Sequence, residues 1–94
     1  MTSDNDIVDN IEQHRYEIEQ NGVLAELVYA RTPHALVLVH TEVPPALRGS
    51  GVGSRLVEFG VAEARRQGLK LVVKCPFARA YLERHPPSDV DRGE

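Results

Sequence analysis

The N-terminal half of the chain alternates apolar and polar positions. Over residues 14–20, Tyr16 and Ile18 face one way and three charged residues face the other, as in a half-buried strand. The dipeptide Asn-Gly at 21–22 follows directly, and both residue types tolerate the positive φ of a two-residue hairpin turn. The pattern therefore predicts a hairpin whose second strand covers residues 23–30.

A third strand is predicted over residues 35–43. It begins with five aliphatic residues in a row, which indicates burial on both faces, and Pro44 stops it. Three consecutive strands of this kind predict an antiparallel meander. Ahead of them, residues 1–13 carry four acidic and no basic residues with few apolar positions. We expect a flexible acidic lead-in there, or a short helical turn within it.

The C-terminal half predicts a helix followed by a strand. Over residues 51–67, apolar side chains recur on one broad arc of a helical wheel, with Glu63 as an exception inside that arc. Gly68 supplies a glycine C-terminus, and a short strand follows at 69–75. The order strand, helix, strand implies a parallel pairing through a right-handed crossover.

Pro76 stands where a second helix can begin, and the Pro-Pro pair at 86–87 ends it. Residues 87–94 are polar and are expected to form a flexible tail. We therefore expect one domain over residues 14–86 with an α+β fold that includes an α/β-like unit. Its predicted order is a three-stranded antiparallel meander, a β-α-β crossover and a C-terminal helix.

Composition agrees with one small globular domain. The chain has 94 residues, of which 41% are hydrophobic and 27% are charged, so one modest core is expected rather than wholesale disorder. The net charge of −3 lacks the basic surplus of a protein that tracks phosphates, which disfavours nucleic-acid binding. The longest aliphatic run has five residues where a membrane span needs about 20, so no membrane partner is expected.

The N-terminus is acidic where a secretory signal would be basic, and no apolar segment follows it, which predicts a cytoplasmic location. The single cysteine, Cys75, cannot form an internal disulfide, and the four histidines show no metal-binding spacing, so no metal is expected. Cys75 is therefore either a buried thiol or a chemically active one.

Three glycines, Gly49, Gly51 and Gly53, lie between the third strand and the first helix. Without side chains they expose the backbone, so an anionic group can reach the free N–H groups at the positive end of the helix dipole. Arg48 and Arg55 add positive charge at the rim. The alternative is a tight connection whose glycines serve only positive φ and close packing.

Spacing excludes two familiar phosphate-binding loops. The Walker A pattern requires Lys-Ser or Lys-Thr after the glycines, and neither dipeptide is present there. The dinucleotide pattern GxGxxG requires a third glycine at the position that Ser54 occupies. Neither ATP hydrolysis nor NAD binding is therefore favoured.

Residues 43–53 read V-x-P-x-x-R-G-x-G-x-G, which resembles the acetyl-coenzyme A loop of the GNAT superfamily of N-acetyltransferases. Residues 75–86 read C-P-F-x-x-x-Y-x-x-x-H-P, as in small single-domain GNAT-like proteins. The resemblance covers about residues 14–86. It implies an enzyme that moves an acetyl group from acetyl-coenzyme A, as co-substrate, to an amine acceptor. The implied coenzyme-binding residues are Val43, Leu47, Arg48, Gly49, Ser50, Gly51, Val52, Gly53 and Ser54.

Cys75 is predicted at the carboxyl end of a strand, the side on which open α/β sheets bind ligands. Lys74 and the N-terminus of the helix that Pro76 opens both favour a thiolate there. Such a thiolate can attack the thioester and form an acyl-Cys75 intermediate, and the resemblance to the small GNAT-like proteins implies the same use. The alternative is a small buried hydrophobe.

Three further side chains are candidates for catalysis. His40 lies near the end of the third strand and can act as a general base, although a lone strand histidine is more often structural. Glu42 shares its face by strand periodicity and resembles the acidic residue that larger GNAT enzymes carry near this strand end. Tyr81 resembles the tyrosine with which larger members protonate the leaving thiolate, and packing against Phe77 is the alternative.

Three functions stay open: an N-acetyltransferase, a coenzyme A or acyl-coenzyme A binding module without productive transfer, and a small interaction domain. For the enzyme, transfer is either direct or through Cys75. The two-residue turn at 21–22 replaces the N-terminal helices with which larger GNAT proteins shape the acceptor groove. The acceptor side is therefore expected to be open, and the amine, on a protein, a peptide or a small molecule, is unknown.

Overall fold

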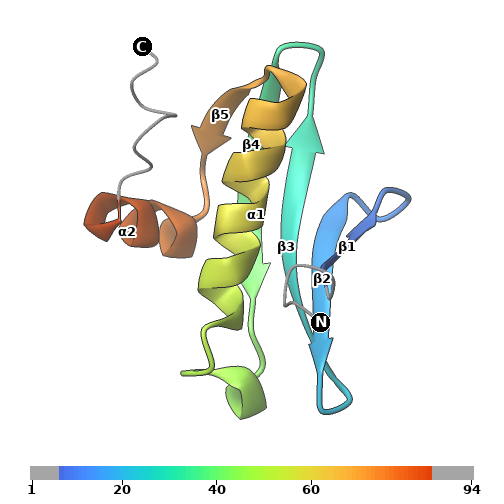
Figure 1. Cartoon of the computed structure of the whole chain (residues 1–94), viewed down its shortest axis with the longest axis vertical. Helices are drawn as coiled ribbons and strands as arrows, with labels where there is room; N and C mark the ends of the chain where they lie inside the picture. The colour runs from blue at the N-terminus through green and yellow to red at the C-terminus, as the bar shows by residue number, and fades with distance from the viewer. Residues whose placement is uncertain (1–6, 86–94) are drawn as a thin grey trace.

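Five strands form one mixed sheet in which they follow one another in chain order (Figure 1). The computed structural model describes residues 7–85. Neighbouring strands are antiparallel from the first to the fourth, and the fifth is parallel to the fourth. The strands are β1 (Ile7–Asn10), β2 (Arg15–Gln20), β3 (Val23–Arg31), β4 (Ala35–Glu42) and β5 (Lys70–Val73).

The helices follow β4. A short 3₁₀ turn, η2 (Pro45–Leu47), leads into α1 (Val52–Gln67), which connects β4 to β5, and α2 (Pro76–Arg84) follows β5. The predicted α+β fold, with its β-α-β crossover and C-terminal helix, is confirmed. The predicted elements differ from the observed ones by one or two residues at their ends. The predicted tail at 87–94 lies outside the described residues.

The strand β1 corrects the prediction of a loose lead-in over residues 1–13, of which 1–6 lie outside the described residues. Ile7 pairs with Ile18 on β2, and its side chain is buried on the same face of the sheet. The Tyr29 hydroxyl on β3 donates to Asp9 Oδ1 at 2.5 Å. These partners are distant in sequence, so four residues alone could not indicate the strand. The antiparallel part of the sheet therefore has four strands instead of three.

The hairpin predicted at 21–22 is confirmed. Asn21 and Gly22 have φ of 55° and 77°, the left-handed conformations that a two-residue turn between twisted strands requires. His14 also has a positive φ, 57°, and it closes the turn between β1 and β2. Its turn conformation explains why β2 begins at Arg15 and not at His14.

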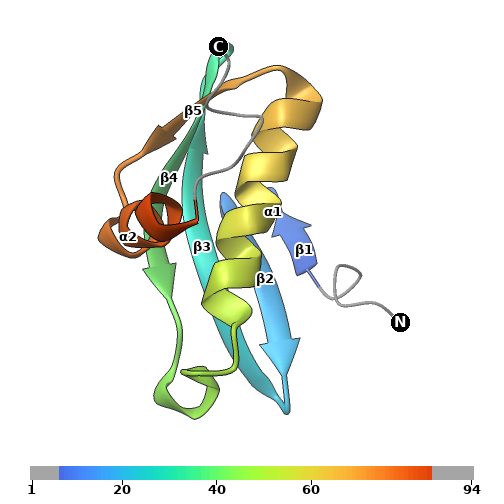
Figure 2. The same cartoon turned by 60° about the vertical axis from the view of Figure 1, so that its left-hand side comes forward.

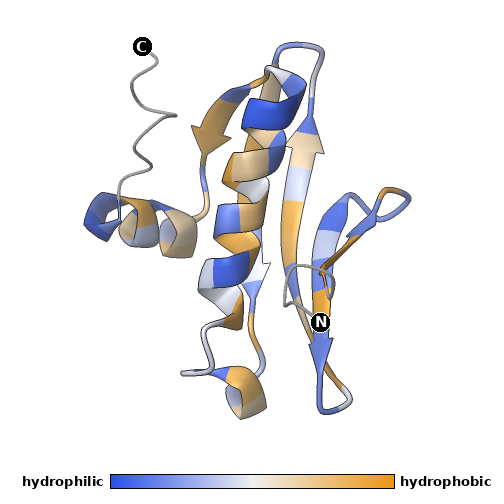
Figure 3. Cartoon of the chain, viewed as in Figure 1, coloured by the Kyte–Doolittle hydropathy of each residue, from blue (hydrophilic) through white to orange (hydrophobic). Residues whose placement is uncertain are grey.

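The core lies between the sheet and α1. Gly60 allows a close approach, because a Cβ at this position would lie 3.1 Å from Leu38 Cδ2 on β4. Figure 1 and Figure 2 show α1 lying over one face of the sheet, with its axis roughly along the strands, and Figure 3 shows the polar residues along its length. The largest fully buried side chains are Tyr16, Ile18, Leu27, Leu36, Leu38, Leu56, Val52, Val57 and Cys75.

Glu63, the polar exception on the apolar arc of α1, is held by neighbours on its own helix. Its carboxylate accepts hydrogen bonds from Arg66 at 2.6 and 3.0 Å and from Gln67 at 2.8 Å, and its side chain is 15% exposed. The bond from Arg66 is the main cause that holds the pKa of Glu63 below its ordinary value of 4.5.

This lowered pKa predicts an acid-dependent contribution to stability. A carboxyl whose pKa is lower in the folded state stabilises the fold above pH 4.5, and the contribution is lost as the pH falls through the folded value. Glu63→Gln should therefore lower the free energy of unfolding at pH 7 and weaken its decline in acid, as measured by urea unfolding at pH 7 and at about pH 3. Glu83→Gln, at an exposed position of α2, is the control. Equal changes in the free energy of unfolding of the two variants would contradict the assignment of this contribution to Glu63.

Candidate active site

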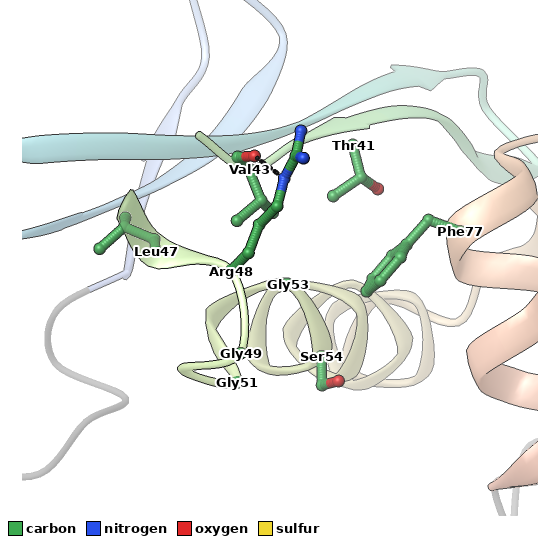
Figure 4. Close-up of a pocket in the computed structure, with 9 residues that line it drawn as sticks. All are labelled: Thr41, Val43, Leu47, Arg48, Gly49, Gly51, Gly53, Ser54 and Phe77. Atoms are coloured by element: carbon green, nitrogen blue, oxygen red, sulfur yellow. Dashed lines mark hydrogen bonds between the residues drawn. The ribbon is translucent and has the colours of Figure 1, made fainter. Parts of the chain in front are cut away.

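A pocket of about 560 Å³ opens where β4, η2, α1 and α2 meet (Figure 4). The turn that carries Gly49, Gly51 and Gly53, called the glycine turn below, forms one side of it. The end of β4 forms another side, and α2 contributes a single aromatic ring. The lining residues are Thr41, Val43, Leu47, Arg48, Gly49, Gly51, Gly53, Ser54 and Phe77. Seven of these nine belong to the predicted coenzyme-binding set, and Thr41 and Phe77 are additional.

The glycine turn leads directly into the N-terminus of α1. Gly49 and Gly51 have φ of 84° and 89°, and Gly51 is the N-cap residue of α1, where no described side chain caps the helix. No acidic residue stands in the first turn of this helix. The first N–H groups of an α-helix have no partner within the helix, so this turn presents them, with the positive end of the helix dipole, to an anion.

Gly53 serves a different purpose from the other two glycines. A Cβ at this position would lie 2.9 Å from Phe77 Cζ and 3.3 Å from Val43 Cγ2. Only a residue without a side chain lets the ring from α2 and the valine from β4 come this close to α1. Phe77 and Val43 thereby form an apolar wall next to the polar turn, which suits a ligand with an anionic end and an apolar arm.

Arg48 reaches from the turn to the end of β4. Its Nε donates to the Val43 carbonyl oxygen at 3.1 Å, and Figure 4 shows the side chain extending from the turn to Val43. Ser50 and Val52, the two predicted binding residues outside the lining set, have other contacts. Ser50 Oγ donates to the Leu47 carbonyl at 2.5 Å, and the Val52 side chain is fully buried.

A β-bulge in β4 sets which side chains face the pocket. Tyr29 of β3 pairs with Leu38, but the preceding Val28 pairs with His40, so Val39 is an extra residue on β4. The extra residue reverses the alternation of side chains. Thr41, opposite the buried Leu27, therefore faces the α1 side of the sheet, although strict alternation would point it away.

The pairing between β4 and β5 ends close to this bulge. Leu38 pairs with Val73, and the Leu38 carbonyl accepts both the Lys74 and the Cys75 amides, at 2.9 and 3.0 Å. The chain then turns into α2, while β4 continues to Glu42. This divergence leaves room for the pocket beside the last residues of β4.

Cys75 lies behind the pocket, next to the lining residue Thr41. It is the N-cap residue of α2, its side chain is 1% exposed, and its Sγ lies 3.0 Å from Thr41 Oγ1. Thr41 itself lines the pocket. The structure therefore places the predicted nucleophile behind the wall of the pocket, with one hydroxyl between. Sequence reasoning missed Thr41 because the bulge that turns it inward leaves no mark in the hydrophobic pattern.

His40 and Glu42 lie on the other face of the sheet. They pair with Val28 and Glu26 of β3, respectively, on the face opposite α1, and the lining of the pocket does not include them. His40 Nε2 and Glu42 Oε1 are 2.9 Å apart, and both side chains are more than half exposed. The structure confirms that these two residues share a face, and it separates that face from the pocket.

Tyr81 is directed toward α1 and not toward the thiol. Its hydroxyl donates to Glu58 Oε2, and its ring stacks on His85 with centroids 4.6 Å apart. The hydrogen bond to Glu58 is the main cause that raises the pKa of the Tyr81 phenol. Tyr81 is not among the described residues that line the pocket. The Tyr81 side chain thus contacts Glu58 and His85. The residue of α2 that lines the pocket is Phe77.

Within 7–85, no group of three or more His, Cys, Asp or Glu side chains is placed to hold a metal ion. No helix in this part of the chain has the length and apolar character needed to cross a bilayer.

Comparison with known proteins identifies the class to which this fold and pocket belong. A family model described as GCN5-related N-acetyl-transferase matches residues 15–91. Among solved structures, the chain resembles a GCN5-like protein from Staphylococcus aureus, named as a candidate N-acetyltransferase and determined by solution NMR. The identity is 31% and the TM-score is 0.70, over 95% of this chain and 89% of that one. A comparison with curated proteins gave no match.

The chain therefore belongs to the GCN5-related N-acetyltransferase family. The resemblance given by the loop and by the segment after β5 is confirmed at the level of the family and of the fold.

Proposed function

We propose that this protein binds acetyl-coenzyme A in the pocket and transfers the acetyl group to an amine acceptor. The observation that carries the proposal is the glycine turn, whose uncapped helix N-terminus adjoins an apolar wall. The turn suits the pyrophosphate of the coenzyme, and the apolar part of the pocket that begins at Val43 suits the pantetheine arm. A cytoplasmic location agrees with this co-substrate and with a single free cysteine.

Titration with two ligands tests the binding step. Coenzyme A should bind at least about tenfold more tightly than pantetheine, because pantetheine lacks the pyrophosphate and loses charge-assisted hydrogen bonds of about 1.5–3 kcal/mol each. Isothermal titration calorimetry at fixed ionic strength measures both dissociation constants. Equal affinities would contradict anion binding at the turn, and no binding of coenzyme A at millimolar ligand would contradict the proposal.

The buried thiol offers a covalent route for the transfer. The Cys75 sulfur attacks the thioester carbonyl carbon, a new carbon–sulfur bond forms, and the bond to the coenzyme sulfur breaks. The thiol proton ends on the departing coenzyme, and Thr41 Oγ1, at 3.0 Å from Sγ, is placed to pass it. The amine acceptor then takes the acetyl group and releases the Cys75 thiol.

Direct transfer is the other route. From the face of the sheet opposite α1, an amine can approach the point where β4 and β5 diverge. On that face it meets the pair formed by His40 and Glu42. In this route the amine nitrogen bonds to the thioester carbonyl carbon, and the bond to the coenzyme sulfur breaks. His40 takes the proton of the attacking amine, and Glu42, 2.9 Å from His40 Nε2, stabilises the imidazolium that results. The imidazolium proton then passes through water to the coenzyme thiolate. Tyr81, whose hydroxyl is hydrogen-bonded to Glu58, has no part in either route in this arrangement of side chains.

The burial of Cys75 and the engagement of Tyr81 favour a second candidate function, a coenzyme A binding module without productive transfer. Both functions require coenzyme A to bind. They differ in whether acetyl-coenzyme A is consumed in the presence of amines, which release of free coenzyme A measures.

A further inference from the structure

We propose that Phe77 limits the length of the acyl chain that this protein accepts, an inference that rests on the proposed binding of acetyl-coenzyme A. The side chain projects from the first turn of α2, which Pro76 opens, toward Gly53 on α1 (Figure 4). No other residue of α2 lines the pocket in the described part of the chain. The Phe77 ring therefore forms the boundary of the pocket on the side of α2.

The two ends of the pocket differ in chemistry. At the glycine turn, backbone donors and Arg48 suit the anionic end of the ligand. At the other end stand Phe77 and Thr41, and Thr41 is hydrogen-bonded to Cys75. A coenzyme whose pyrophosphate lies on the turn directs its thioester toward this second end. The acyl group then meets the Phe77 ring.

The ring packs against Gly53 of α1 on one side and is open to the pocket on the other. Its Cζ lies 2.9 Å and its Cε2 3.1 Å from the point where a Gly53 Cβ would stand, so the ring fills the space that a side chain at position 53 would need. Phe77 is 43% exposed, so a large part of the ring is open to the pocket that it lines. The exposed part of the ring faces space that a ligand covers, and the part against α1 gives it a rigid support.

These contacts explain a preference for a short acyl chain. In the proposed pose a two-carbon acyl group ends before the ring, whereas each added methylene would have to push the ring out of its contact with Gly53. Replacing Phe77 by alanine removes the volume of a benzyl group and opens an apolar space in its place. Longer acyl chains should then gain about fourfold in affinity for each methylene that becomes buried.

The test compares coenzyme A, acetyl-coenzyme A and butanoyl-coenzyme A on the whole chain by isothermal titration calorimetry. In the wild type, butanoyl-coenzyme A should bind more weakly than acetyl-coenzyme A. In Phe77→Ala, the ratio of the butanoyl to the acetyl dissociation constant should fall at least about tenfold, for two methylenes. Phe77→Leu should give a smaller fall in the same ratio.

Leu82→Ala is the matched control, because Leu82 lies on the same helix, packs against the core and does not line the pocket. It should leave the ratio unchanged. An equal shift in Leu82→Ala would mean that a loosened α2 is the cause, and it would overturn the proposal. So would an unchanged ratio in Phe77→Ala, or an equal loss for all three ligands, which would place the ring along the pantetheine. Failure of the wild type to bind coenzyme A is a different result, and it would overturn the proposed function itself.

Discussion

Gly51→Val should weaken coenzyme A binding by at least about a hundredfold. Gly51 caps α1 with φ of 89°, a conformation that costs a β-branched residue about 1–3 kcal/mol. A valine that relaxes toward negative φ turns the first N–H groups of the helix away from the ligand, and each charge-assisted hydrogen bond lost costs about 1.5–3 kcal/mol. The dissociation constant for coenzyme A, measured by calorimetry, checks this result.

Gly22→Val is a matched control for the strain alone. Gly22 has φ of 77° in the hairpin between β2 and β3, and neither glycine has an atom within 4 Å of its would-be Cβ. Both substitutions therefore add the same side chain to a left-handed residue in open space. They should lower the free energy of unfolding by similar amounts, but only Gly51→Val should lose coenzyme affinity. Retained binding in Gly51→Val, or an equal loss in Gly22→Val, would show that the binding turn is elsewhere.

Cys75→Ala should abolish covalent acetylation of the protein by acetyl-coenzyme A. The covalent route requires a sulfur at this position, and no second cysteine is present to replace it. Intact mass spectrometry after incubation with acetyl-coenzyme A, without an amine, should show one added acetyl group on the wild type and none on the variant. Because Cys75 is buried and small, alanine should be accommodated with little change in fold.

Thr41→Val separates the chemistry of this pair from its packing. Valine keeps the shape of the side chain and removes the hydroxyl that lies 3.0 Å from Sγ. Slower acetylation of Cys75 with unchanged affinity for coenzyme A is the expected result. If Cys75→Ala still transferred the acetyl group to an amine at the full rate, the covalent route would be wrong, and the pair formed by His40 and Glu42 would become the place to look for the base.

The parts of this fold that sequence could predict are those set by neighbours along the chain. The hairpin at 21–22 follows from two residues that accept positive φ, and α1 follows from its apolar arc. The glycine turn was predictable for the same reason, since glycines at alternate positions between a strand and a helix expose backbone whatever surrounds them. Seven of the nine predicted coenzyme-binding residues line the pocket.

The parts that sequence could not predict depend on contacts between distant residues. β1 is a strand because Ile7 pairs with Ile18 and Asp9 accepts a bond from Tyr29, and four residues are too few to show a period. The bulge at Val39 shifts the alternation of β4 by one residue, so that Thr41 faces the pocket. Tyr81 lies away from the pocket because Glu58, more than twenty positions earlier, bonds its hydroxyl.

The order of strands across the sheet has a consequence for how the protein folds. Each strand lies next to its neighbour in the chain, so β1 to β4 assemble through short turns with little loss of loop entropy. The crossover through α1 is the one long connection within the sheet. We expect the antiparallel strands to form the folding nucleus and α2 to dock last. The helix that brings Cys75 and Phe77 to the pocket is thus the final element to arrive, and ligand affinity should be the last property that the refolding protein recovers.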